Sequence, residues 1–197
     1  MVRAHRDDEV GSRRARSGAE CLAEFVAVTD ERLAQLRGFG PDDFAAESWT
    51  PTGPGTVRDL LPFRIFDAWV HEQDMRRAVA VPGDLDGPVA DAAMTRIATT
   101  MPFVVGKKVA PPDGTTVLFD LGAPLAGRYA VLVEGRARLL DDAPAAPTTR
   151  VVTDGETFAR VACGRVEPGA ALGDGRVRVE GDEALGRRVV ESLNFLF

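Results

Sequence analysis

The feature of this sequence that most limits its fold is a change in apolar spacing at the Pro-Pro-Asp-Gly run of residues 111–114. Before this run, apolar residues recur every three or four positions, which is typical of one face of an α-helix. After it they alternate with polar residues, which is typical of one face of a β-strand. Proline and glycine interrupt both kinds of element. The sequence therefore predicts a helical part followed by a part built around a sheet, an α+β fold.

Three helices are predicted before the Pro-Pro-Asp-Gly run, at residues 19–36, 56–80 and 88–104. Glycines at 38 and 40 should end the first helix. Residues 41–55 contain three prolines and predict a loop. Thr56 offers its hydroxyl as an N-cap for the second helix. Pro62 lies near the first turns of that helix, where we expect a kink rather than an end.

The part after residue 114 predicts short strands and short helices. We expect strands at residues 116–121, 128–134, 136–140, 149–153 and 176–180. Asp154 and Asp182 each precede a predicted helix, over residues 156–163 and to about residue 193, and a third helix is expected over 168–172. The predicted domains are a mobile arm over 1–17, a helical domain over 18–110 and an α+β domain over 115–197.

Composition excludes several classes of function. The net charge is −6 and the arginines are scattered, so the clustered positive charge that binds nucleic acid is missing. No apolar run approaches the ~18 residues of a membrane span, and the N-terminus lacks the apolar core of a secretion signal. Cys21 and Cys163 are too far apart in sequence to form a metal motif. We therefore expect a cytoplasmic protein with a small-molecule substrate and no nucleic-acid or membrane partner, in which Cys163 is a buried structural thiol.

Charged side chains follow one line of the second predicted helix. On a helical wheel Arg64, His71 and Asp74 lie within about 60° of Asp67, and apolar residues flank this line on both sides. Because apolar residues flank the line, we expect Asp67 and His71 to face the interior. A buried charge must be paired or bound to a metal, so we also expect these two side chains to approach one another. Trp69 points to the opposite side of the wheel and is expected to pack against another element.

Two interpretations of this line remain open. One is an internal network of Arg64, Asp67 and His71 that fixes helix packing. The other is a divalent metal bound by Asp67 and His71, because residues four apart on a helix project side by side. A catalytic zinc usually takes three protein ligands, and the one other histidine of the sequence is His5. The ligand set is therefore incomplete on the residues alone.

Three segments resemble a known family. They are WTPTGPGTVRDLLPFRIFDAWVHEQDMRRA at residues 49–78, DGETFARVACGRV at 154–166 and GRVRVEGDEALGRRVVESLNFLF at 175–197. They are similar to actinobacterial members of the mycothiol-dependent maleylpyruvate isomerase-like family. The last segment is also similar to the end of sterol-carrier-like domains. The resemblance implies a partial DinB-like helical bundle followed by a small sterol-carrier-like α+β domain.

The resemblance also implies a site. In the family a divalent metal, usually zinc, is bound by a histidine from an early helix and by an acidic residue and a histidine four positions apart. His71 matches the last of these, and Asp67 stands where a glutamate is usual. The W-T-x-x-D-x-x-x-H helix that carries the first histidine would precede this chain. We therefore expect a truncated member with weak or absent metal, and Arg64 as a candidate substrate-binding residue.

The function implied is that of a metal-dependent, mycothiol-using isomerase or thiol-transferase homologue. In the family the thiolate of mycothiol adds to a double bond and is later expelled, which gives cis–trans isomerisation. The alternative is a non-enzymatic protein that binds a small apolar ligand, and a third reading is an inactive subunit of a larger assembly. A bundle lacking one helix would uncover Phe63, Phe66 and Val70, so the chain should form a homodimer, cover this face with its own later elements or be poorly soluble.

Overall fold

The computed structural model describes residues 10–196. The chain forms two compact units, Met1–Arg58 and Asp59–Phe197. This division lies elsewhere than the predicted boundary at residues 111–114, and the predicted domain limits stay a prediction. The arm expected over residues 1–17 lies partly outside the described residues. Within them, no helix is long and apolar enough to cross a membrane.

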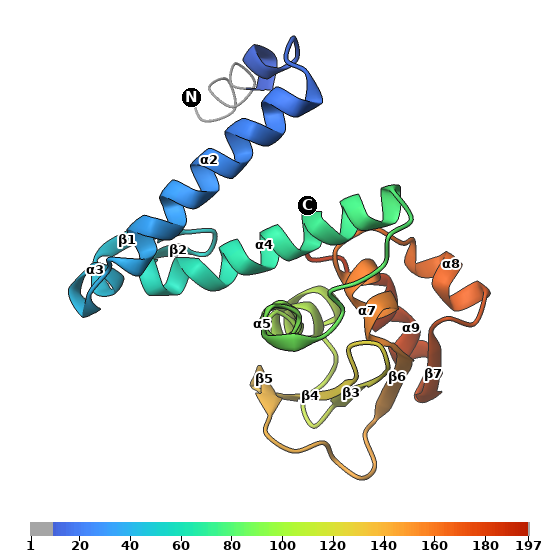
Figure 1. Ribbon diagram of the computed structural model, residues 1–197. Coiled ribbons are helices and arrows are strands. Elements are labelled where there is room, and N and C mark those ends of the chain that lie inside the picture. The colour runs from blue at the N-terminus through green and yellow to red at the C-terminus, as the bar shows by residue number, and fades with distance from the viewer. Residues whose placement is uncertain (1–9, 197) are drawn as a thin grey trace. The chain divides into compact units, whose positions relative to one another are not determined.

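Among its described residues, the first unit contains a short helical segment at residues 10–13, two further helices and a hairpin (Figure 1). Helix α2, Gly18–Arg37, confirms the prediction. It begins with a capping box in which Ser17 and Glu20 each accept the other's backbone N–H. Its apolar side chains are largely exposed, among them Leu22, Phe25 and Val26.

The loop predicted over residues 41–55 is wrong in part. Helix α3, Pro41–Ala45, is followed by strands β1, Glu47–Thr50, and β2, Gly53–Thr56, which pair as an antiparallel hairpin. The turn is closed by the Thr50 hydroxyl, which donates to the Gly53 carbonyl at 2.9 Å. Gly53 adopts a φ of 119°, which a side chain would strain. The sequence Gly-Pro-Gly-Thr of β2 has no apolar alternation, so the strand could not be predicted from its pattern.

Helix α4, Val57–Ala78, confirms the second predicted helix and continues through Pro62. Its buried residues are Phe66, Trp69, Val70 and Gln73, so the expected packing of Trp69 is confirmed. The ring of Phe66 lies 5.9 Å from that of Phe195, centroid to centroid. Phe66 and Val70 are therefore covered by the second unit's own core, which is one of the outcomes expected for an incomplete bundle.

The second unit is built on a five-stranded sheet in the order β5-β4-β3-β6-β7. The strands are β3 Thr116–Gly122, β4 Gly127–Glu134, β5 Arg136–Leu140, β6 Thr149–Asp154 and β7 Arg178–Gly181. Only the pair β3–β6 is parallel among the strands described. All five strands were predicted, although β7 begins two residues later than expected.

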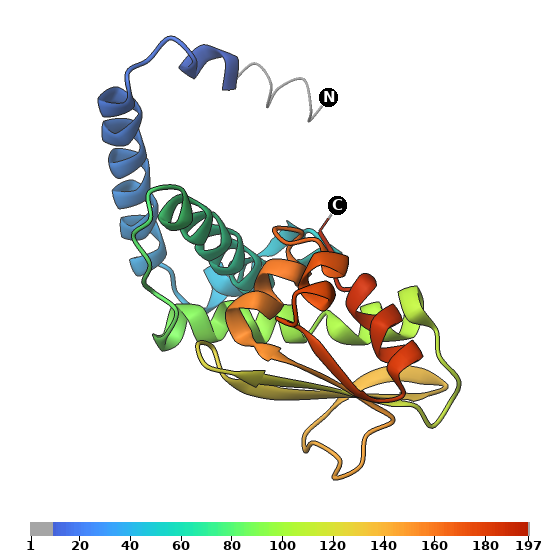
Figure 2. The ribbon, with the colours of Figure 1, turned by 90° about the vertical axis from the view of Figure 1, so that its right-hand side faces the viewer.

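Helices cover one face of this sheet (Figure 2). They are α5 Gly87–Ala98, α6 Met101–Phe103, the π-helix η1 Val104–Val109, α7 Gly155–Ala162, α8 Pro168–Gly173 and α9 Glu183–Glu191. The third helix, predicted over residues 88–104, is confirmed only in part: α5 ends at Ala98, and α6 and η1 follow after residues 99–100. Asp154 and Asp182 accept N–H bonds from Thr157 and Leu185, which confirms both predicted N-caps.

The core lies between the sheet and these helices. Phe119 of β3 and Phe158 of α7 are fully buried, with ring centroids 5.4 Å apart. Ile97 of α5 and Trp69 of α4 join the same cluster. The layered arrangement of helices on a largely antiparallel sheet confirms the α+β prediction.

Candidate functional site

The predicted site residues lie on the face of α4 that is turned away from the core. The side chains of Arg64, Asp67 and His71 are 67, 50 and 63% exposed. The expectation that Asp67 and His71 face the interior is therefore wrong. Phe66, Trp69, Val70 and Gln73 form the packed face instead. Apolar residues flank the charged line on both sides of the wheel. The rest of the fold therefore decides which side of α4 packs against the core.

The expected approach of Asp67 and His71 is present. Oδ1 of Asp67 lies 3.6 Å from Nε2 of His71. Oδ2 of the same carboxylate lies 3.3 Å from Nη1 of Arg64, which donates to it. The Arg64–Asp67–His71 network thus exists, but at the surface rather than inside.

A complete metal site is not formed by the described part of the chain, which holds no group of three histidine, cysteine or acidic side chains placed around one point. Asp74 Oδ2 lies 3.5 Å from His71 Nδ1, the ring nitrogen that faces away from Asp67. Asp74 is therefore placed to orient the imidazole rather than to share an ion with Asp67. His5 lies outside the described residues. Asp67 and His71 as metal ligands, and Arg64 as a substrate-binding residue, stay predictions.

Asp74 is also the partner of Arg165, which follows α7. Nη2 of Arg165 donates to Oδ2 of Asp74 at 2.8 Å, and its Nη1 donates to the Cys163 carbonyl at 2.6 Å. The hydrogen bond from Arg165 lowers the pKa of Asp74, with smaller contributions from Arg77 and His71. Arg165 was not singled out from the sequence, since its partner is 91 residues away.

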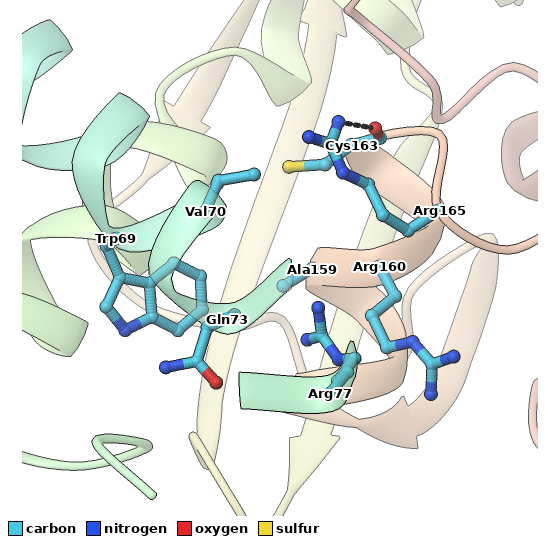
Figure 3. Close-up of a pocket in the computed structure, with 8 residues that line it drawn as sticks. All are labelled: Trp69, Val70, Gln73, Arg77, Ala159, Arg160, Cys163 and Arg165. Carbon is cyan, nitrogen blue, oxygen red and sulfur yellow. Dashed lines mark hydrogen bonds between the residues drawn. The ribbon is translucent and has the colours of Figure 1, made fainter. Parts of the chain in front are cut away.

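A pocket lies between α4 and α7 (Figure 3). It is lined by residues of both helices and of the turn after α7: Trp69, Val70, Gln73, Arg77, Ala159, Arg160, Cys163 and Arg165. A second pocket of about 290 Å³ shares Gln73, Arg77 and Arg160 with it. Arginine side chains therefore line a continuous region beside α4, which the sequence pattern does not predict.

Cys163 does not provide a nucleophile for this pocket. Its side chain is buried, and burial raises the pKa of the thiol to about 12. The thiolate is the reactive form, so the thiol is inert near neutral pH. The prediction of a buried structural thiol is confirmed.

The two arginines of α9 lie at the surface. Arg187 donates to Glu183 at 3.0 Å, and Arg188 donates to the Val109 carbonyl at 2.6 Å.

Comparisons with known proteins support the family resemblance. Residues 1–76 match the model of the mycothiol maleylpyruvate isomerase N-terminal domain. The match includes Asp67 and His71, and it also includes the segment interpreted as an arm. A search of curated proteins gave no match.

Several solved sterol carrier structures are similar to the chain. The ubiquinone synthesis protein UbiJ-SCP2 is 11% identical, with 54% of this chain and 96% of that chain covered and a TM-score of 0.41. Sterol carrier protein 2 of Yarrowia lipolytica in its apo form is 7% identical, with 54 and 94% covered and a TM-score of 0.37. The sterol carrier protein domain 2 of Helicoverpa armigera is 13% identical, with 56 and 95% covered and a TM-score of 0.38.

The elements described above define an α+β protein with a helical N-terminal region. Residues 1–76 resemble the mycothiol maleylpyruvate isomerase N-terminal domain, and this match covers less than half of the chain.

Proposed function

We propose that this chain is a mycothiol-using isomerase or thiol-transferase homologue in which Asp67 and His71 supply two ligands to a divalent metal. The observation that carries the proposal is their arrangement. They stand four residues apart on an exposed face of α4, inside the segment that matches the family, with Oδ1 and Nε2 3.6 Å apart. The substrate is a small molecule.

The distance fits two ligands of one ion. Ligand atoms at about 2.0–2.2 Å from a tetrahedral zinc lie roughly 3.4 Å from one another. The carboxylate of Asp74, 3.5 Å from Nδ1, would orient the ring and hold Nε2 toward Asp67. A bound divalent cation would favour the thiolate form of mycothiol near neutral pH.

Arg64 adds a positive group to this face. Its guanidinium lies 3.3 Å from Asp67 and is 67% exposed, so its remaining N–H groups point to solvent. A guanidinium binds a carboxylate through two parallel hydrogen bonds. Arg64 would therefore hold an anionic substrate close to the Asp67–His71 pair.

Zinc titration of chelator-treated protein tests the proposal. We expect weak binding, because two protein ligands leave most of the coordination to water. His71→Ala and Asp67→Asn should each lower the zinc affinity at least about tenfold. Glu134→Gln, which removes a 71% exposed carboxylate on the sheet, is the matched control and should bind zinc as the unaltered chain does.

Two results would count against the proposal. One is equal zinc affinity in the unaltered chain and both variants. The other is one zinc per chain that survives dialysis and is unaffected by His71→Ala, which would place the metal elsewhere. Should zinc be held firmly but lost in His71→Ala, a further ligand exists, and His5→Gln would test the other histidine of the sequence.

The alternative of a small apolar ligand stays a prediction. The two pockets beside α4 are lined in part by arginines, so they do not favour it.

A further inference from the structure

Arg160 of α7 differs from the arginines around it. Its Nε is buried and has no hydrogen-bond partner in the described structure. By contrast, Arg76 pairs with Glu72 and Asp84, and Arg77 pairs with Glu156 at 3.2 Å. Among the described residues, no carboxylate lies within ion-pair distance of Arg160. One positive charge in this region is therefore left without compensation.

An unpaired guanidinium in a partly buried position is costly. Burying a hydrogen-bond donor without a partner loses its hydration, and the loss is larger for charged groups. A guanidinium stays protonated in proteins, so it cannot relieve this cost by losing its charge. An acceptor with negative charge that reaches the guanidinium would offset this cost through charge-assisted hydrogen bonds.

The pocket that Arg160 lines has a mixed lining and a volume of about 290 Å³. Its charged side chains are Arg76, Arg77, Arg160 and Glu156, and Glu156 pairs with Arg77 at 3.2 Å. Its apolar residues are Ala80, Pro82 and Leu85. The amide of Gln73 is already used, because it donates to the Gly83 and Asp84 carbonyls at 3.2 and 3.3 Å.

The terminal nitrogens of Arg160 are the groups that remain available. Nε is the only Arg160 atom found buried without a partner in the described structure, and neither Nη makes a hydrogen bond there. Both Nη groups therefore keep solvent-accessible surface. Figure 3 shows the Arg160 and Arg77 side chains extending from α7 and α4, and both line the two pockets. The two Nη groups at the end of a guanidinium can donate two parallel hydrogen bonds to the two oxygens of a carboxylate.

We propose that this pocket binds a small organic carboxylate whose anionic end pairs with Arg160 and whose short apolar chain lies against Ala80, Pro82 and Leu85. Arg160 selects an anion, because Arg76, Arg77 and Glu156 already have ion-pair partners. The apolar residues select an anion with a hydrocarbon body, which inorganic phosphate lacks. The volume lies at the lower end of the range for small-molecule sites, so the chain should be only a few carbons long. Asp67 and His71 do not line the pocket, so the inference is independent of the proposed metal site.

Calorimetric titration in the presence of a chelator tests this proposal. The probes are butyrate and hexanoate, with butyramide as the neutral analogue and inorganic phosphate as the anion without an apolar body, all at equal ionic strength. We expect saturable binding of a carboxylate, and no binding of butyramide. Phosphate should bind at least about tenfold more weakly than the better carboxylate, a difference of about 1.4 kcal/mol.

Substitutions of Arg160 test whether this residue binds the carboxylate. Arg160→Gln should reduce carboxylate affinity at least about tenfold, and Arg160→Lys, which keeps the charge but loses the fork, should retain part of it. Arg138→Gln on β5, a 57% exposed arginine, is the matched control and should bind as the unaltered chain does. Arg160→Gln removes the unpaired donor, so its thermal stability without ligand should be no lower than that of the unaltered chain.

Three results would overturn the proposal. They are the absence of saturable carboxylate binding by the unaltered chain, equal affinity in Arg160→Gln, and equal affinity for phosphate. The last would indicate a site for inorganic anions in general. A loss of thermal stability in Arg160→Gln would show that the guanidinium is already satisfied by the protein, and would remove the premise.

Discussion

Replacing Asp74 with asparagine should destabilise the second unit measurably. Asp74 accepts a 2.8 Å hydrogen bond from Arg165 and lies 3.6 Å from Nη1 of Arg77 and 3.5 Å from Nδ1 of His71. Asparagine keeps the shape of the side chain but not its charge. Asp67→Asn is the matched control, since Asp67 lies on the same helix and pairs with Arg64 at 3.3 Å.

The expected magnitude follows from exposure. Hydrogen bonds to charged groups contribute about 1.5–3 kcal/mol, which solvent screening reduces. Asp74 and Arg165 are 33 and 29% exposed, so we expect a loss of about 1–2 kcal/mol. Asp67 and Arg64 are 50 and 67% exposed, so Asp67→Asn should cost only about 0.3–0.5 kcal/mol. For a chain of this size, each kcal/mol corresponds to about 2–4 °C in Tm.

The effect should depend on pH in a defined direction. In the folded protein the pKa of Asp74 is lowered from its usual 3.8. The stabilisation is therefore complete above pH 3.8 and is lost as the pH falls through the lowered value. Thermal unfolding followed by circular dichroism, in the presence of a chelator, should show the largest difference between the unaltered chain and Asp74→Asn at neutral pH. The difference should shrink on acidification.

The reasoning would be refuted by equal Tm values for Asp74→Asn and Asp67→Asn at neutral pH. It would also be refuted by a difference from the unaltered chain that persists at acidic pH, because an effect of packing alone would not titrate.

Three further predictions concern burial and association. Cys163 should resist alkylation at neutral pH in the native protein, because burial raises the pKa of its thiol to about 12, and it should react once the protein is denatured. Cys21 is partly exposed and should react in both states, which mass spectrometry of the alkylated protein can show. Phe158→Ala should lower the free energy of unfolding by about 3–5 kcal/mol in urea denaturation, since Phe158 is fully buried, and an effect below 1 kcal/mol would contradict the assigned core. The homodimer stays a prediction, and light scattering that gives the monomer mass over a wide concentration range would count against it.

Much of the second unit could be predicted because its signals are local. Strands β3, β4 and β6 follow the alternation of apolar residues, and each is confirmed. Asp154 and Asp182 can be predicted as N-caps because an aspartate carboxylate accepts a free backbone N–H of the first helical turn. These features depend on neighbours within a few residues, which is the range over which a single sequence carries information.

The orientation of α4 could not be predicted for the opposite reason. Its wheel carries apolar residues on both sides of the charged line, and only the surface that it packs against selects between them. That surface includes Phe195, which is 129 residues beyond Phe66 along the chain. The Asp74–Arg165 bond and the arginine-lined pockets depend on contacts of the same range, between α4 and the region of α7. Contacts between residues so far apart in the sequence produce no periodic pattern from which they could be predicted.

The corrected orientation changes the meaning of the charged line itself. Inside a core, Asp67 and His71 would have required pairing to offset the cost of burial, and that need alone would have explained their proximity. At the surface this explanation fails, because an exposed pair of this kind contributes only about 0–1 kcal/mol. The packing of α4 rests on Phe66, Trp69, Val70 and Gln73 instead. One face of the helix therefore accounts for stability, and the other presents a carboxylate, an imidazole and a guanidinium to solvent, where a metal and an anionic substrate could reach them.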